Sequence, residues 1–344
     1  MSDGIRGARR PIVGLSALVL VGAACAAEPG SDADDRAQGG GGRVAVVTTV
    51  SPITNIAQNV GGDCVTITGI VPEGTNSHTF EPQPSDAAAF AEADIVFING
   101  LHLEEPTREL AEANVPESAP IVELGSMTIA PDEYIYDFSF PGSEGDPNPH
   151  LWTNPLLAGR YAEIMKDELS QLDPGCADTY EANHRAFAAR IDELDRMVRD
   201  VTATVPDDNR KLLTYHDSFP YFAREYGWEI VGAIQPSDFA DPTPQDVARL
   251  IDQIRSENIP AILGSEVFAS PVLEQIASEA GAAYIDDLRD DDLPGENGDA
   301  EHSYLGLMVF DFETFMGALG GDPSVLAQLD TTNLQPGDDV EYRS

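Results

Sequence analysis

The sequence predicts an α/β fold with two Rossmann-like lobes, each built on a parallel sheet, and one long helix that joins them. Short apolar segments such as 44–50 alternate with helix-length segments, which is typical of parallel sheets. The same alternation recurs in the second half of the chain. Between the halves, apolar residues recur at helical spacing over a span too long for one small lobe.

The first lobe is expected over 44–172. Apolar, β-branched segments predict its strands, and intervening segments with helical periodicity predict its helices. Pro155 occupies the first-turn position that proline favours in a helix. The predicted strands cover 44–50, 65–71, 95–99 and 121–124, and the predicted helices cover 52–60, 84–93 and 154–172.

The linking helix is expected over 173–205. Asp173 would be its N-cap, Pro174 would open its first turn, and Pro206 would end it. A helix of about 30 residues is roughly 45 Å long, which suits a rigid connector between lobes. Its apolar positions are Tyr180, Phe187, Ile191, Leu194, Val198 and Val201.

The second lobe is expected over 206–321, followed by a polar tail over 322–344. Its strands and helices alternate as in the first lobe, and Thr243 is expected to cap one helix. The predicted strands cover 211–215, 228–233, 261–264 and 282–285, and the predicted helices cover 218–226, 244–258, 271–280 and 304–319.

Residues 1–25 have the features of a signal peptide. Arginines at positions 6, 9 and 10 precede the apolar run 12–24, which is too short to span a bilayer comfortably. The segment ending at Cys25 resembles a bacterial lipobox, although Gly22 stands where leucine is usual, so we expect lipid on Cys25. The Gly-rich, acidic segment 26–43 is expected to be a flexible tether. The folded body is therefore expected outside the cytoplasm, anchored to the cell membrane or free in the periplasm.

The composition is strongly acidic, with 60 acidic and 19 basic residues and a net charge of −41. Such a surface repels phosphate backbones, which excludes nucleic acid as a partner. In an oxidising compartment, Cys64 and Cys176 are expected either to form a disulfide or to remain separate thiols.

Three of the six histidines lie where a parallel sheet would present ligands. His216 follows a predicted strand, His78 lies in the loop after another, and His150 ends a Pro/Gly-rich loop. Asp286 also follows a predicted strand. Ligands bind beyond the carboxyl ends of such strands, and three imidazoles with one carboxylate form a tetrahedral zinc set. Spacing alone leaves open that these histidines are structural.

Four local motifs decide between these alternatives. Segments 76–82, 148–155, 216–219 and 284–288 resemble, in order, the ligand motifs of the zinc/manganese-binding receptor lipoproteins of bacterial ABC importers. The resemblance runs from about residue 44 to residue 320. It implies two lobes with a metal between them, a membrane permease as partner, a monomer, and no enzymatic activity.

The resemblance also implies the metal ligands. They are His78, His150, His216 and Asp286, with Asp287 as the rival for the fourth position. Imidazole in the third position favours zinc, and manganese is the alternative. The segment 131–148 departs from many zinc-binding members because it contains no histidine.

Residues around the ligands are expected to have supporting roles or none. Glu266 and Glu81 are candidates to orient a ligating imidazole. Asp146-Pro147 precedes Asn148-Pro149, so the usual aspartate of the family motif is either replaced by Asn148 or shifted. The acidic run that ends at Asp292 is expected to be solvated beyond its first residues, and so is His302.

Two other functions fit parts of this pattern. A zinc hydrolase would use three histidines and Glu266 to activate water, but it needs the coordination position that Asp286 would fill. A surface adhesion lipoprotein would use the metal only as a structural element.

Overall fold

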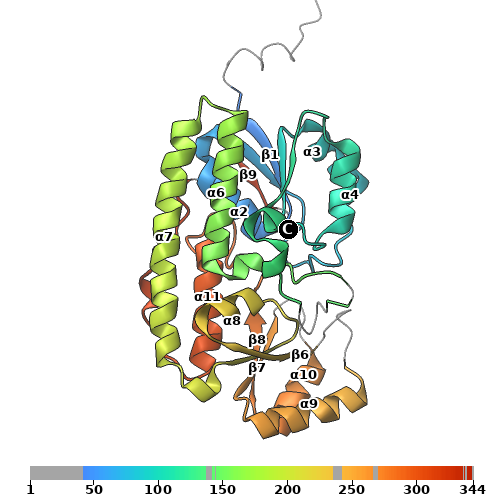
Figure 1. The fold of residues 1–344 in the computed structure, drawn as a ribbon, viewed down its shortest axis with the longest axis vertical. Coiled ribbons are helices and arrows are strands. Elements are labelled where there is room, and N and C mark those ends of the chain that lie inside the picture. Colours follow the sequence, from blue (N-terminus) through green and yellow to red (C-terminus); the bar gives the residue numbers. More distant parts are fainter. Residues whose placement is uncertain are drawn as a thin grey trace, which may run out of the picture. The chain divides into compact units, whose positions relative to one another are not determined.

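The computed structural model describes residues 42–136, 142–143, 145–234, 242–265, 270–335, 337 and 339–342. The expected signal peptide 1–25 with Cys25, nearly all of the tether 26–43, and Glu266 lie outside the described residues. The compact unit that begins at Arg43 contains two parallel sheets with helices around them, which confirms the predicted α/β class and its two lobes (Figure 1).

The first sheet is built mainly from the first half of the chain, and all its pairings are parallel. Because parallel strands end at one edge, the loops that follow them open toward the same side. The residues of β3 are all buried, as expected for a strand covered on both faces. Across the sheet the order is β4 (Ile121–Glu123), β3 (Ile95–Ile98), β1 (Val44–Thr48), β2 (Val65–Gly69) and β9 (Val340–Glu341).

Helices cover this sheet, and one of them is buried along its whole length. Every residue of α2 (Ser51–Gly61) is buried, because α2 packs against β2 on one side and against α6 (Pro155–Leu172) and α7 (Ala177–Thr204) on the other. The sequence did not predict α4, since this helix is polar and buries only Thr107 and Ala111. The other helices of the lobe are α3 (Ala87–Glu92), α4 (Glu105–Asn114), α5 (Leu124–Thr128) and α6 (Pro155–Leu172).

The long helix α7 (Ala177–Thr204) has 28 residues and buries the apolar positions that its periodicity predicts. It begins three residues later than expected. Asp173 instead ends α6, and its Oδ1 accepts the N–H of Gly175, so the chain turns before α7 starts after Cys176.

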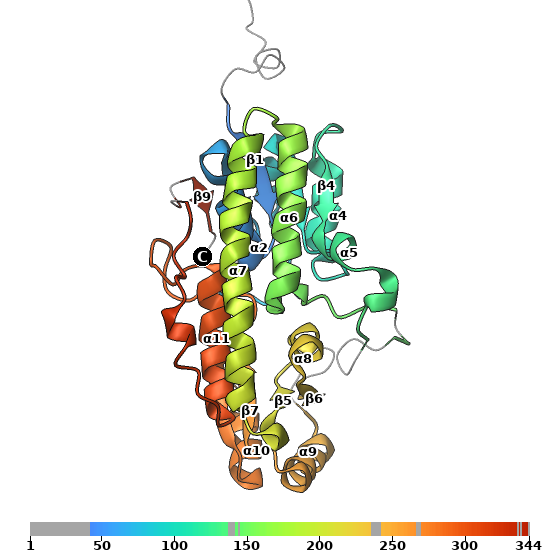
Figure 2. The same cartoon turned by 60° about the vertical axis from the view of Figure 1, so that its left-hand side comes forward.

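Both lobes pack against α7, as Figures 1 and 2 show. In the first lobe, Asn183 Nδ2 donates to the carbonyl of Val60 at 3.1 Å. In the second, Trp228 Nε1 donates to Thr202 Oγ1 at 3.2 Å. The helix therefore contacts both lobes along its length and does not merely span a gap between them.

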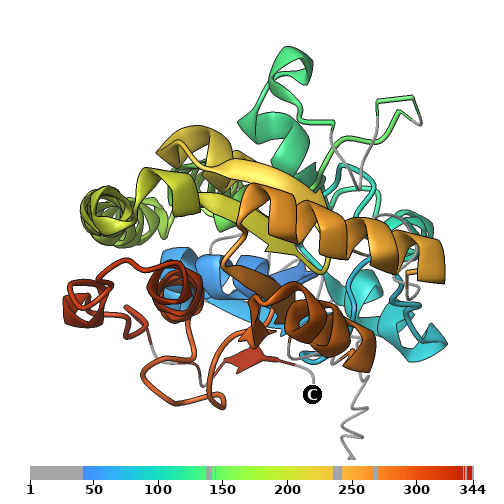
Figure 3. The same cartoon turned by 90° about the horizontal axis from the view of Figure 1, so that it is seen from below.

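The second sheet has strand order β6 (Glu229–Ala233), β5 (Lys211–Thr214), β7 (Ala261–Ser265) and β8 (Ala283–Leu288). Leu212 and Leu213 belong to different core clusters because successive strand residues face opposite sides. One face is covered by α9 (Pro244–Glu257) and α10 (Pro271–Ala280). The other is covered by α8 (Pro220–Tyr226) and α11 (Tyr304–Ala318), and Figure 3 shows α11 end-on beside α7.

The segment expected as a polar tail returns to the first lobe. Val340 and Glu341 form β9, which pairs with β2 at the edge of the first sheet. Tyr342 and Asn333 each accept a hydrogen bond from Asn55 Nδ2 of α2. After α11, the chain therefore returns to the first lobe, where it supplies hydrogen-bond partners for the buried amide of Asn55.

Cys64 and Cys176 form a disulfide that links the start of β2 to the start of α7. Among the residues that the structure describes, none of the helices combines the length and the apolar character required to cross a membrane.

Candidate metal centre

His78 lies in the loop that follows β2 at the carboxyl edge of the first sheet. Its backbone N–H donates to Asn76 Oδ1 at 2.9 Å, a local turn that orients the residue. The side chain is half-buried. Since the loop contains Pro72 and Gly74, it leaves the sheet edge instead of continuing the strand.

His150 lies between Pro149 and a single 3₁₀ turn, Leu151–Thr153, that precedes α6. The side chain is buried, and its Nδ1 lies 2.9 Å from Asn148 Oδ1. The backbone N–H of His150 donates to the same oxygen at 3.0 Å. The ring is therefore held by a residue of its own loop.

His216 follows β5 after Tyr215, at the carboxyl edge of the second sheet, and is buried. Its Nδ1 lies 3.6 Å from Asp290 Oδ2. Tyr215 packs edge-on against the His216 ring, with centroids 4.6 Å apart, and its hydroxyl donates to Asp290 Oδ1 and Oδ2 at 3.5 and 3.4 Å.

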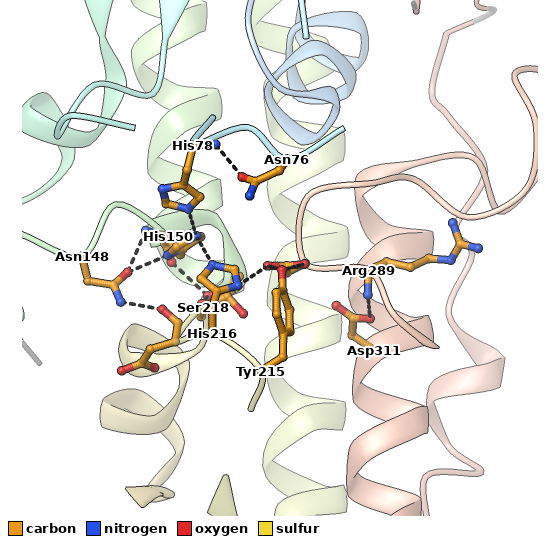
Figure 4. A network of polar contacts seen from close by, with 12 residues as sticks. Asn76, His78, Asn148, His150, Tyr215, His216, Ser218, Arg289 and Asp311 are labelled. Carbon is orange, nitrogen blue, oxygen red and sulfur yellow. Dashed lines mark hydrogen bonds and ion pairs between the residues drawn. The ribbon is translucent and has the colours of Figure 1, made fainter. Parts of the chain in front are cut away.

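The three imidazoles meet between the lobes, as Figure 4 shows. His150 Nε2 lies 3.0 Å from His78 Nε2 and 3.0 Å from His216 Nε2. In the part of the chain that the structure describes, these residues form the one group of three or more potential metal-ligating side chains with donor atoms within 4.8 Å of one another. Tetrahedral zinc with nitrogens at about 2.1 Å would place neighbouring donors about 3.4 Å apart, which is close to the 3.0 Å separations of His150 from His78 and from His216.

Burial keeps the three rings neutral. Loss of solvation lowers the pKa of His78 to about 4. The pKa values of His150 and His216 fall well below the usual value for histidine, first through burial and then through the neighbouring imidazoles. Neutral imidazole is the form that binds metal, so the rings need not lose protons to do so at neutral pH.

The carboxylates beside the histidines come from Asp290 and Asp291. Both line a pocket together with His78 and His216. Burial, and then the charge of Asp292, raises the pKa of Asp291 to about 8. A cation between the histidines and this side chain would favour its ionised form.

Asp286 does not reach the histidines in this structure. The strand β8 extends to Leu288, and the side chains of Asp286 and its rival Asp287 are exposed on it. Only after Leu288 does the chain reach the pocket that the histidines line, at Asp290 and Asp291. The sequence analysis expected Asp286 there because it ended the strand at residue 285.

Other sequence expectations are also corrected. Asp290, Asp292 and His302 are buried, although the acidic run and His302 were expected to be solvated. His302 Nε2 lies 3.7 Å from the carboxylate of Glu73, and burial lowers the pKa of His302. The side chain of Glu81 is exposed, so it does not orient a histidine here.

The segment 290–292 belongs to the second half of the chain but is held by the first lobe. Trp152 Nε1 donates to the carbonyl of Asp290 at 2.7 Å, and Ser51 Oγ donates to the carbonyl of Asp291 at 2.8 Å. Gly74 N donates to Asp292 Oδ2 at 2.8 Å. These bonds fix the acidic segment beside the histidines from the opposite lobe.

A second set of hydrogen bonds joins the loops that carry His150 and His216. Thr153 Oγ1 donates to the carbonyl of Ser218 at 2.8 Å, and Asn154 Nδ2 donates to the carbonyl of Tyr221 at 3.3 Å. The Tyr221 hydroxyl donates to the carbonyl of Asn148 at 2.9 Å. We call this set the interlobe seam. No local pattern in the sequence predicts this set.

Comparison with known proteins identifies a consistent set of relatives. The family model for the periplasmic zinc-uptake complex component A, ZnuA, matches residues 46–318. The manganese-binding lipoprotein MntA of Halalkalibacterium halodurans is 27% identical over 88% of this chain and 95% of its own. The iron-binding protein YfeA of Yersinia pestis is 30% identical over 80% of this chain and 86% of its own.

Solved structures with the same fold include the periplasmic zinc-binding protein TroA of Treponema pallidum. It superposes with a TM-score of 0.71 at 27% identity, covering 81% of this chain and all of TroA. A cadmium-bound periplasmic metal-binding protein of Candidatus Liberibacter asiaticus superposes with a TM-score of 0.70 at 28% identity over the same share.

Proposed function

This chain belongs to the family of the periplasmic zinc-uptake component ZnuA, and we propose that it captures one divalent metal ion, zinc in preference to manganese, for an ABC importer. Family membership confirms the resemblance that the four sequence motifs indicate. The members of this family are binding components of uptake systems, and the proposal contains no catalytic step.

The observation that carries the proposal is the convergence of three neutral imidazoles, of which those of His150 and His216 are buried and that of His78 is half-buried. The Nε2 atoms of His78 and His216 each lie 3.0 Å from Nε2 of His150. Three nitrogen donors of this kind suit a borderline metal such as zinc. Manganese favours carboxylate and carbonyl oxygens, so a set with three nitrogens supports zinc as the preferred cargo.

We propose that the fourth donor is a carboxylate oxygen from Asp290 or Asp291 instead of Asp286. Both residues line the pocket beside His78 and His216. The proximity of Asp290 to His216 Nδ1 suits a carboxylate that orients the ring, because ligating histidines usually donate their second N–H to such a group. That role for Asp290 favours Asp291 as the metal ligand.

Delivery would take place at a membrane permease. Several relatives are named as substrate-binding lipoproteins of metal ABC transporters, including PsaA of Streptococcus pneumoniae. By analogy, Cys25 would carry a lipid that anchors a monomeric receptor at the outer face of the cell membrane. Mass spectrometry of the mature protein from membranes would detect the lipid on Cys25, and an unmodified N-terminus elsewhere would contradict the anchor.

Elemental analysis of protein purified without chelators tests the metal. Zinc at about one ion per chain, retained in competition with an excess of manganese, is the expected result. A protein that retains manganese and releases zinc would overturn the preference, and one that binds neither would overturn the receptor function.

A further inference from the structure

We propose that Asn148 is a positioning residue that sets the tautomer of the His150 ring and, with the same side chain, holds the turn that carries His216. This inference rests on the proposed function, since it concerns two of the proposed ligands. Asn148 is not itself a proposed ligand. Its amide oxygen contacts His150 of the first lobe, and its amide nitrogen contacts Asp217 of the second.

The oxygen of the amide acts on His150. Asn148 Oδ1 accepts the backbone N–H of His150 at 3.0 Å, and a backbone N–H can only donate. The same oxygen lies 2.9 Å from His150 Nδ1, so Nδ1 must carry the proton. In a neutral ring this leaves the lone pair on Nε2, the atom that faces His78 and His216.

The nitrogen of the amide acts on the loop of His216. Asn148 Nδ2 donates to the carbonyl of Asp217 at 2.7 Å, and this contact crosses from one lobe to the other. The turn at Asp217 is closed by Ser218 N, which donates to the carbonyl of His216 at 3.1 Å. Fixing the carbonyl of Asp217 therefore fixes the direction in which the His216 side chain leaves the backbone.

Asn148 is itself held firmly enough to transmit this constraint. Its side chain is completely buried. Its backbone N–H donates to the carbonyl of Ile135 at 2.9 Å, and its carbonyl accepts the hydroxyl of Tyr221 at 2.9 Å. Proline on either side, at 147 and 149, restricts the backbone further.

Aspartate at this position would keep the hydrogen bonds to His150 but lose the one to Asp217. A carboxylate accepts the two N–H groups of His150 as well as the amide does. However, its second oxygen would face the carbonyl of Asp217, and two acceptors in a buried contact repel each other. The amide is therefore required for the interlobe bond, and a carboxylate is not an equivalent replacement.

The test compares Asn148→Asp with Asn154→Asp in the full chain, using zinc and a competing chromophoric chelator. Asn154 is a matched control because its amide also donates across the seam, but it caps α6 and bonds neither histidine ring. We expect Asn148→Asp to weaken zinc binding by about 10- to 100-fold and to speed zinc dissociation, with Asn154→Asp within about twofold of the wild type. Equal zinc affinity and dissociation rate in Asn148→Asp and the wild type would overturn the inference.

A measurement on the wild-type chain keeps the test independent of how the variant folds. Nitrogen-15 NMR of the metal-free protein reports which ring nitrogen of each histidine carries the proton, and His150→Gln identifies the signals of His150. We expect protonated Nδ1 and unprotonated Nε2 for His150. The opposite tautomer would overturn the inference. A wild-type chain that shows the expected tautomer but binds no zinc would instead overturn the proposed function.

Discussion

The Nε2 atoms of His150 and His216 lie 3.0 Å apart, although 66 residues and the boundary between the lobes separate them. Each ring also contacts another side chain. The His150 ring contacts Asn148, the His216 ring faces Asp290, and Trp152 of the first lobe bonds the carbonyl of Asp290. The bond from Trp152 thus links the first lobe to the residue that faces His216.

Replacing His150 or His216 should abolish tight zinc binding. His150→Gln and His216→Gln each remove one nitrogen donor from the buried group, and we expect zinc affinity to fall by roughly 100-fold or more. Competition with a chromophoric chelator measures the affinity, and circular dichroism checks the fold. His184→Gln on α7 is the control, because His184 lies outside the three-histidine group. Equal losses in all three variants would argue against this site.

Asparagine substitutions should show which aspartates contribute to zinc binding. Asp291→Asn and Asp290→Asn should each lower zinc affinity by about tenfold or more, since both side chains line the pocket with the histidines. Asp286→Asn should leave the affinity within about twofold of the wild type, because Asp286 is exposed on β8. If Asp286→Asn gave the largest loss, the assignment to the segment 290–292 would be wrong.

The metal-free protein should lose stability through its imidazoles as the pH falls from about 6.5 toward 4. Burial lowers the pKa of His78 to about 4, whereas an unfolded histidine titrates near 6.5. Between these values the unfolded state binds more protons, so this contribution is complete above 6.5 and declines as the pH falls. Buried Glu104, whose pKa is raised to about 7, acts in the opposite direction, because its folded state binds more protons between about 4.5 and 7.

Comparison with His78→Gln isolates the imidazole contribution, because the effect of Glu104 is common to both proteins. Chemical denaturation at intervals from pH 4.5 to pH 8 should give the wild type a steeper loss of unfolding free energy toward acid than the variant. Parallel curves would show that His78 is not buried in its neutral form.

Reducing the disulfide should affect stability and leave metal binding unchanged. Cys64 and Cys176 are 112 residues apart in sequence, and closing a loop of that size contributes about 4–5 kcal/mol in the chain-entropy model. Cys64 precedes β2, whereas His78 follows that strand, so roughly 16 Å of strand separates the disulfide from the site. Serine at both positions should lower the thermal midpoint and retain the zinc affinity. A parallel loss of affinity would contradict this separation.

Most of the fold follows from patterns within short segments. The run 44–48 is apolar and β-branched and forms β1, and the helical spacing from Tyr180 to Val201 produces α7. Neither α4 nor β9 was predicted, because α4 is polar on average and the two residues of β9 are too few to show a period. The start of α7 was misplaced because Asp173 and Pro174 resemble a helix start, whereas the turn that ends α6 uses Asp173 instead.

By itself, the sequence predicted the class of fold, the family and the three histidines that the structure brings together. Each of these predictions depends on a pattern within a short segment, and each histidine lies in a local motif of its own. The tertiary structure alone decided which carboxylates stand beside the imidazoles, what Asn148 bonds, and where residues 322–342 pack. Those outcomes depend on contacts between distant segments, such as Ser51 with Asp291, which are 240 residues apart. Local patterns carry no information about such pairs, because buried polar groups are satisfied by whichever partners the folded backbone brings within reach.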